Sequence, residues 1–236
     1  DILCAGFPCQ PFSHIGLREG FKHATQGTMF HEIISVVDKN KPKCIFLENV
    51  PGMANHDKGN TLKIILKELE KREYNYSYKI LNSYDFGVPQ NRKRFYLVGI
   101  KNGPIFEFPN IKKKHMNIGE YLENNINSYS ISEHLQRSYI YKKNDGRPFT
   151  IDQTTKGGTK TLVSSYHKIQ RLTGTFVKDG PTGLRLLTEN ECKILMGFPK
   201  EFIFPVSRTQ MYRQLGNSVA IPVVKKIAKE ITKYLN

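Results

Sequence analysis

Tryptophan is absent from this 236-residue chain, and cysteine is scarce. The four cysteines are too few and too scattered for a disulfide framework: Cys4, Cys9, Cys44 and Cys192. No C-x-x-C pair and no His/Cys cluster has the spacing of zinc ligands. No apolar run approaches the roughly 18 residues that a membrane span needs. We therefore expect a cytoplasmic protein with neither a metal nor a membrane partner.

Acidic residues are also in short supply, with 21 Asp and Glu against 36 Lys and Arg, which gives a formal net charge of +15. Hydrophobic residues make up 39 % of the chain and charged residues 24 %, which is typical of a soluble globular protein and argues against disorder. A positive surplus of this size indicates a polyanionic partner, most often nucleic acid.

The first hundred residues alternate between strand-like and helix-like patterns. The predicted order is strand, helix, strand, helix and two further strands, at residues 1–4, 27–38, 43–47, 60–73, 78–81 and 94–100. The short apolar run at 43–47 predicts a buried parallel strand. Asn60 or Thr61 is the expected N-cap of the second helix. This order predicts an open α/β sheet with functional sites at the C-terminal ends of its strands.

The pattern changes after Lys101, where Lys, Asn, Ser, Thr and Tyr dominate and periodicity is weak until about residue 185. Regularity returns at a capping box formed by Thr188 and Glu191, and Pro222 opens a last amphipathic helix. We therefore expect two domains. Residues 1–101 plus 208–236 form the larger one, and residues 102–207 form a smaller, irregular one.

Four short segments carry residues that could perform chemistry: GFPCQPFS at 6–13, FLENV at 46–50, PQNRKRF at 89–95 and QLGNSV at 214–219. Each has an ordinary structural interpretation when taken alone. Cys9 could be a small buried residue in a tight turn, and Glu48 could be a helix cap or a surface acid. The two alternate arginines could form a solvated strand edge, and Gly216-Asn217 could be a turn before the last helix.

Together and in this order, these segments resemble the cytosine carbon-5 DNA methyltransferases of bacterial restriction–modification systems. The shared motifs are PCQPFS, ENV, QNRKR and GNSV, with RLLTENECKILMGFP between the last two. The resemblance implies a Rossmann-like α/β sheet that uses S-adenosylmethionine, with a smaller target-recognition domain. It also implies methylation of carbon 5 of a flipped-out cytosine in a specific duplex DNA site, in the bacterial cytoplasm and at the nucleoid.

The resemblance also assigns catalytic roles to individual residues. Cys9 would add to ring carbon 6 as a thiolate, which makes carbon 5 nucleophilic. Glu48 would hydrogen-bond or protonate ring nitrogen 3, so that negative charge does not accumulate on the ring. Arg92 and Arg94 would hold the carbonyl oxygen of the base, the flanking phosphate and the surroundings of the cysteine.

Cofactor and DNA contacts carry over less completely. The positions that match the family's cofactor pocket are Pro8, Met29, Asn217, Ser218 and Val219. The expected DNA contacts are Gln10, Ser13, Lys160 and Thr161, the last belonging to a Thr-Leu pair that resembles the one such enzymes place near the target phosphate. The family's F-x-G-x-G cofactor loop is absent. An N-terminal portion of the enzyme, which a separate chain could supply, is therefore a further expected partner.

Two alternative functions remain open at this point. Without the cofactor loop, the chain could be an inactive DNA-binding fragment, or a subunit that needs a partner to bind the cofactor. One branch of the family modifies transfer RNA, so an RNA cytosine-5 methyltransferase is the other alternative.

Overall fold

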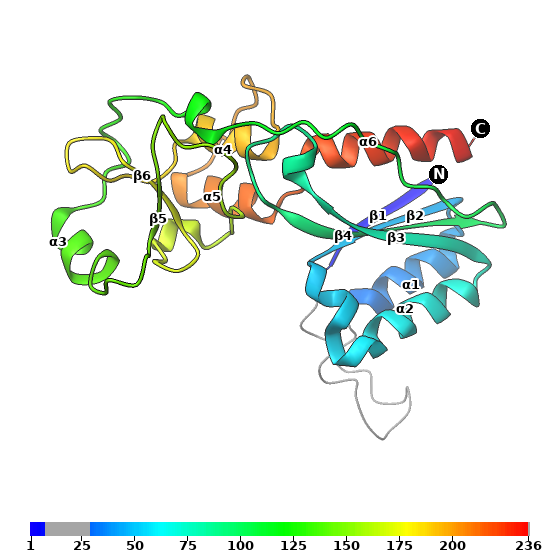
Figure 1. Cartoon of the computed structure of the whole chain (residues 1–236). Coiled ribbons are helices and arrows are strands. Elements are labelled where there is room, and N and C mark those ends of the chain that lie inside the picture. The colour runs from blue at the N-terminus through cyan, green and yellow to red at the C-terminus, as the bar shows by residue number, and fades with distance from the viewer. Residues whose placement is uncertain (8–28, 236) are drawn as a thin grey trace. The chain divides into compact units, whose positions relative to one another are not determined.

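The computed structural model describes residues 1–7 and 29–235 (Figure 1). These residues pack into two compact units. Unit 1 contains Asp1–Leu81, Lys93–Asn110 and Lys226–Asn236, and unit 2 contains Asn82–Arg92 and Ile111–Lys225. The packing thus assigns residues 208–225 to the same unit as the middle of the chain. The domains expected from the sequence were divided by function and not by packing, so their boundaries stay a prediction.

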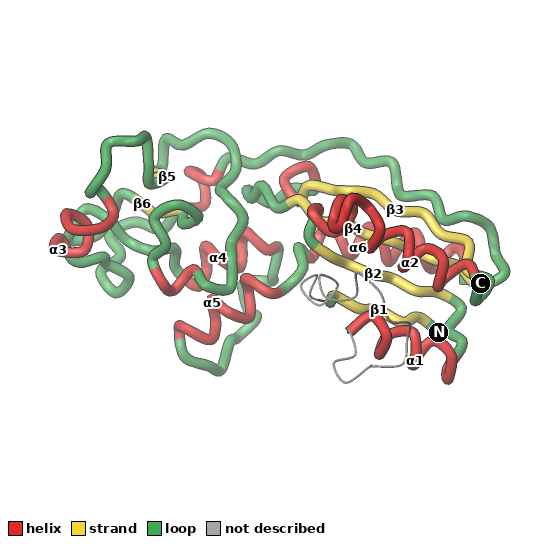
Figure 2. The backbone as a smooth tube through the Cα atoms, turned by 90° about the horizontal axis from the view of Figure 1, so that it is seen from below, coloured by secondary structure: helices red, strands yellow, loops and turns green. Residues whose placement is uncertain are grey.

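Unit 1 is built on a four-stranded sheet in the order β1-β2-β4-β3, whose strands lie side by side in Figure 2. The strands are β1 (Ile2–Gly6), β2 (Cys44–Asn49), β3 (Tyr74–Asn82) and β4 (Lys93–Lys101). β1 runs parallel to β2, and β4 runs antiparallel to it. β2 is almost fully buried, as its continuous apolar run predicts for a strand whose two faces are both covered. The predicted α/β sheet is confirmed.

Helices lie on both faces of this sheet (Figure 1). α1 (Met29–Asn40) and α2 (Asn60–Glu70) cover one face, and the part of α6 (Ile221–Ile231) that belongs to unit 1 lies over the other. The core under α2 includes Leu62, Ile65 and Leu69. Burying each of these side chains contributes about 1.5–3 kcal/mol. None of the described helices is long and apolar enough to span a membrane.

The predicted N-cap of α2 is wrong. The cap is Gly59, in the left-handed region with φ 87°, and neither Asn60 nor Thr61 takes that position. The cause is the run of tight turns at Pro51–Gly59, which already brings Asp57 and Lys58 to positive φ just before the helix. Thr61 is buried inside α2, and its hydroxyl lies 2.6 Å from Nδ1 of His56.

Unit 2 has little regular structure, as the weak periodicity predicts. It contains a parallel pair of short strands, β5 (Phe149–Ile151) and β6 (Thr175–Val177), and the helices α3 (Glu133–Leu135), α4 (Glu189–Met196) and α5 (Arg208–Asn217). The predicted capping box is confirmed, because the Thr188 side chain accepts from the Glu191 backbone and the Glu191 carboxylate accepts from the Thr188 backbone. A single apolar core joins α4 and α5 to the loops.

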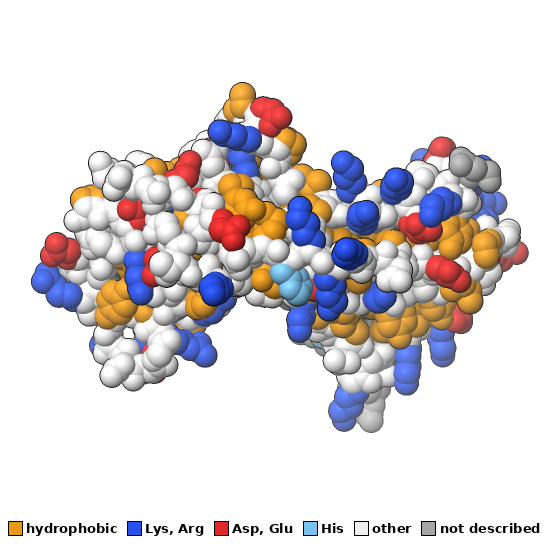
Figure 3. All heavy atoms as spheres, turned by 45° about the horizontal axis from the view of Figure 1, so that its top comes forward, with side chains coloured by type: hydrophobic (Ala, Val, Ile, Leu, Met, Phe, Trp, Pro, Cys, Tyr) orange, Lys and Arg blue, Asp and Glu red, His pale blue; other side chains and the backbone are white. Residues whose placement is uncertain are grey.

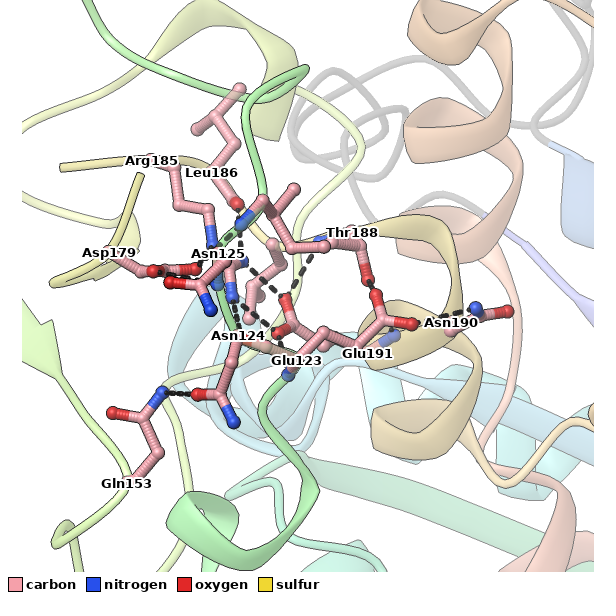
Figure 4. Close-up of polar contacts among 12 residues, drawn as sticks. Glu123, Asn124, Asn125, Gln153, Asp179, Arg185, Leu186, Thr188, Asn190 and Glu191 are labelled. Atoms are coloured by element: carbon pink, nitrogen blue, oxygen red, sulfur yellow. Dashed lines mark hydrogen bonds and ion pairs between the residues drawn. The ribbon is translucent and has the colours of Figure 1, made fainter. Parts of the chain in front are cut away.

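A buried network of charges organises this unit around the start of α4 (Figure 4). The side chains of Arg185 and Glu191 are both fully buried and form two parallel hydrogen bonds of 2.8 Å. Arg185 Nε also binds Asp179 at 2.8 Å, and Nη2 donates to the Glu123 carbonyl at 2.7 Å. One guanidinium therefore ties α4 to the nearby loop at Asp179 and to the loop at Glu123, which is distant from it in the sequence.

We expect Arg185→Met to lower the free energy of unfolding by about 3–5 kcal/mol, because it leaves the buried Glu191 carboxylate without its partner. Urea unfolding followed by circular dichroism measures the change. Lys233→Met is the control. Its ion pair with Glu230 has a lysine side chain that is 63 % exposed, so its loss should cost about 1 kcal/mol or less. An equal loss in both variants would contradict a structural role for the Arg185–Glu191 pair.

Candidate active site

The carboxylate of Glu48 lies at the end of β2, beside the last residue of β1. Glu48 is the register partner of Gly6, and a Cβ added to Gly6 would lie 3.4 Å from Glu48 Oε2. The sheet therefore presents the acid beside Gly6, two residues before the PCQPFS segment in the sequence. The predicted residues Pro8, Cys9, Gln10 and Ser13 lie outside the described residues.

Asn49 fixes the backbone that leads into this segment. Its buried Nδ2 donates to the carbonyl of Phe7 at 2.8 Å, and its Oδ1 accepts from the Val50 amide at 2.8 Å. The ring of Phe7 packs against Phe30 with centroids 6.0 Å apart. β2 thus supplies both an acid and a positioning amide. The motifs assigned no role to this amide, although Asn49 stands in the ENV motif next to the acid.

Arg94 extends from β4 and pairs with Glu48, with Nε 3.1 Å from Oε1. The side chains are 15 % and 18 % exposed, so the pair is mostly shielded from water. Arg94 Nη1 also donates to the Lys93 carbonyl at 2.8 Å. The adjacency of β2 and β4 therefore brings together two of the residues predicted from separate motifs.

Arg92 has a different environment from Arg94, although the two alternate in the sequence. It precedes β4, belongs to unit 2 and is only 3 % exposed. Its guanidinium donates to three backbone carbonyls, those of Leu162 at 3.0 Å, Gly216 at 3.2 Å and Ser218 at 2.6 Å. Arg92 thus links the segment that contains the Thr-Leu pair to the GNSV segment.

Gln90 is a second connection within unit 2 that the sequence analysis did not single out. The fully buried amide accepts from the Leu162 backbone at 2.7 Å and donates to the Leu195 carbonyl at 2.7 Å. Thr161 Oγ1 donates to the Asn91 carbonyl at 2.7 Å, so the QNR segment runs along the Thr-Leu pair. Only the charged residues of QNRKR had been assigned roles, and a neutral amide carries no comparable signal in the sequence.

The interpretation of Gly216-Asn217 as a turn is wrong, because both residues belong to α5, which ends at Asn217 with Ser218 as its C-cap. Gly216 is instead required by close packing. A Cβ there would lie 2.2 Å from the Ser164 nitrogen and 2.3 Å from the Val163 carbonyl carbon. Any larger residue would force these two segments apart.

The residues predicted to line the cofactor pocket differ in exposure. Asn217 is exposed at the end of α5, while Ser218 and Val219 are half-buried in unit 2. Met29 is 49 % exposed at the start of α1 in unit 1. These four residues are therefore all at least partly accessible to a ligand.

A cavity of about 300 Å³ in unit 1 contains none of the motif residues. It is lined by Val37, Asp38, Lys41, Lys71, Arg72, Glu73, Tyr74 and Lys101. The C-terminal ends of α1 and α2 lie here, and cationic side chains stabilise such ends. These cations therefore have a structural explanation, and the motif residues remain the candidate site.

Comparison with known proteins bears directly on these motifs. Residues 1–233 match the model of the C-5 cytosine-specific DNA methylase family. The Type II methyltransferase M.MspI of Moraxella sp is 64 % identical over 233 residues, and M.BsuFI of Bacillus subtilis is 50 % identical over 232 residues. The alignments cover 98 % and 97 % of this chain but only 56 % of each relative. M.NlaX of Neisseria lactamica is 38 % identical over the whole chain, which covers 77 % of it.

Solved structures show the same fold. The S. pombe Dnmt2 methyltransferase has a TM-score of 0.76 at 22 % identity, and the match covers 100 % of this chain and 79 % of that one. A putative DNA modification methyltransferase of an E. coli prophage has a TM-score of 0.71 at 19 % identity, with the same two coverages. The motifs, the fold and the match to the family model agree, and the chain belongs to the C-5 cytosine-specific DNA methylase family.

Proposed function

We propose that this chain is the part of a Type II DNA (cytosine-5-)-methyltransferase that carries the catalytic acid, the nucleophile and the target-recognition residues. The observation that supports this proposal is the Glu48–Arg94 ion pair beside Gly6, because Gly6 stands two residues before the PCQPFS segment in the sequence. The 64 % identity to a Type II methyltransferase supports the same activity, in a bacterial restriction–modification system.

In this proposal each group has one task. The Cys9 thiolate adds to carbon 6 of a flipped-out cytosine, and Glu48 donates a hydrogen bond or proton at nitrogen 3. Arg94 holds Glu48 and the carbonyl oxygen of the base. The carbonyl contacts of Arg92 support a positioning task for it, in place of the direct contact with the base that the resemblance suggests.

The cofactor is S-adenosylmethionine, which supplies the methyl group when bound. The chemistry of the available groups fits it. The Asn217 amide and the Ser218 hydroxyl can hydrogen-bond its polar groups, and the exposed thioether of Met29 offers an apolar contact. Pro8 and Val219 would complete the contacts that this chain contributes.

A further partner of the chain would be an N-terminal portion of the enzyme, on the same or a separate polypeptide. β1 has one neighbour among the described strands, and on this strand Ile2 is 40 % exposed and Cys4 is also exposed. The edge of a sheet presents backbone N–H and C=O groups that can pair with a further strand, so this edge suits the addition of another strand. The first two relatives are also longer than the stretch they share with this chain.

Methyl transfer from radiolabelled S-adenosylmethionine to duplex DNA and to transfer RNA tests the proposal. We expect label in DNA only, once the N-terminal portion of a close relative is added to the chain. Titration calorimetry of the chain alone with S-adenosylmethionine shows whether it binds the cofactor unaided. Label in transfer RNA would favour the RNA enzyme. DNA binding without any transfer in the reconstituted protein would favour the inactive DNA-binding fragment.

A further inference from the structure

One buried arginine fixes the whole course of an exposed loop in unit 2, residues 140–147, here called the anchored loop. Arg171 is 7 % exposed and forms an ion pair with the Asp145 carboxylate, in which Nη1 donates to Oδ2 at 2.9 Å. It also donates to three carbonyls of the loop, those of Ile140 at 2.7 Å, Lys143 at 2.9 Å and Arg147 at 3.2 Å. The anchored loop therefore has a preorganised backbone, although only its first residue, Ile140, belongs to a helix.

The exposed charges of the anchored loop that could bind a ligand are all positive. Lys142, Lys143 and Arg147 are exposed, and Asp145 is the loop's one acid. Its hydrogen bonds with Arg171 hold the pKa of the Asp145 carboxyl down, at about 2. The negative charge is thus committed to the buried guanidinium, and the three outward cations have no acid of their own loop to neutralise them.

Lys160 extends this positive surface. Its Nζ lies 5.4 Å from the centroid of the Phe149 ring, two residues after Arg147, and donates to the Leu172 carbonyl at 3.1 Å. Burial and then the charge of Arg147 lower the pKa of the Lys160 ammonium, so the two cations are close enough to repel each other. A bound anion would relieve this repulsion.

Exposed aromatic side chains stand among these cations. Tyr141 is 50 % exposed, and Tyr139 is 44 % exposed with its hydroxyl accepting from the Arg171 amide at 3.4 Å. Tyrosine hydroxyls and lysine and arginine side chains are the groups that contact DNA phosphates and sugars. A rigid backbone reduces the ordering cost when such groups bind.

We propose that the anchored loop and Lys160 form a surface that binds the sugar–phosphate backbone of duplex DNA, with Lys142, Lys143 and Arg147 as the phosphate contacts. This inference rests on the proposed function and adds a DNA-contacting loop that none of the motifs includes. Because phosphate contacts position a protein without reading bases, the surface would strengthen binding to every sequence alike.

The test is a salt titration of duplex binding by the 236-residue chain and its K142A/K143A/R147A variant. Each lost phosphate contact should reduce the slope of log affinity against log salt by about 0.9, so the triple variant should lose about 2.7. The matched control is K226A/K229A/K233A, which removes three exposed cations from α6 and its C-terminal extension. This control should change the slope by less than the value of about 0.9 that corresponds to one phosphate contact. Circular dichroism verifies that both variants stay folded.

Equal loss of slope in the two variants would overturn the inference, because net charge alone would then explain binding. An unchanged slope in the loop variant would overturn it as well, while leaving the proposed function intact. Absence of duplex binding by the unsubstituted chain would instead contradict the proposed function, and this inference with it. If the loop variant lost affinity for one DNA sequence only, the loop would read bases and would not contact phosphates, and the inference would be wrong.

Discussion

Methyl transfer should disappear when Cys9 is replaced by serine in the reconstituted enzyme. The serine hydroxyl is a far weaker nucleophile than a thiolate at neutral pH, so addition to carbon 6 of cytosine would stop. DNA that contains 5-fluorocytosine should form a covalent adduct with the unsubstituted protein, because the fluorine cannot leave carbon 5 as a proton does. Mass spectrometry of the trapped peptide then identifies the attached residue.

The matched control is Cys4→Ser, which changes an exposed cysteine on β1 of the same unit. The surrounding strand residues partly shield the Cys4 thiol from water and raise its pKa, so this residue is a poor source of thiolate. Its replacement should leave transfer and trapping intact. An adduct that still forms with Cys9→Ser and disappears with Cys4→Ser would move the nucleophile to β1. A variant that neither traps DNA nor binds it would point to misfolding, which a comparison of thermal unfolding resolves.

Local patterns in the sequence predicted the elements that local forces determine. The apolar run at 43–47 became β2, and the helical spacing of Leu62, Ile65 and Leu69 became the buried face of α2. The capping box before α4 was also predictable, because both of its hydrogen bonds lie within four residues. The last helix followed from Pro222 and the regular apolar positions after it.

The contacts that assemble the candidate site could not be predicted in this way. Arg92 bonds to Gly216 and Ser218, more than 120 positions further along the chain, and Asn49 bonds to Phe7, which lies 42 positions before it. Nothing in the local pattern around an arginine or an amide shows which distant carbonyl it will meet. The same holds for Gly216, whose neighbours suggest a turn and whose actual constraint is the backbone at residues 163–164. Only the order of the motifs indicated that these segments belong together.

The second large effect concerns Glu48. We expect Glu48→Gln to reduce the rate of methyl transfer by about 10²–10⁴-fold, because glutamine keeps the shape of the side chain but has no carboxyl proton for ring nitrogen 3. DNA affinity should change little, since the substitution leaves the cationic surface intact. Single-turnover rates with saturating S-adenosylmethionine measure the effect, because they separate the chemical step from binding.

The contact with Arg94 makes a control of stability necessary. Glutamine can still accept from Arg94 Nε through its carbonyl oxygen, but a guanidinium that is 15 % exposed would lose its charged partner. Glu73→Gln is the comparison, because Glu73 pairs with Lys101 at 3.4 Å with a side chain that is 67 % exposed. It should change neither the rate nor the unfolding free energy by a measurable amount. A Glu48→Gln enzyme that is less stable but transfers methyl groups at the normal rate would reduce Glu48 to a structural partner of Arg94. A normal unfolding free energy combined with a rate that falls at least a hundredfold would leave proton donation as the function of this acid.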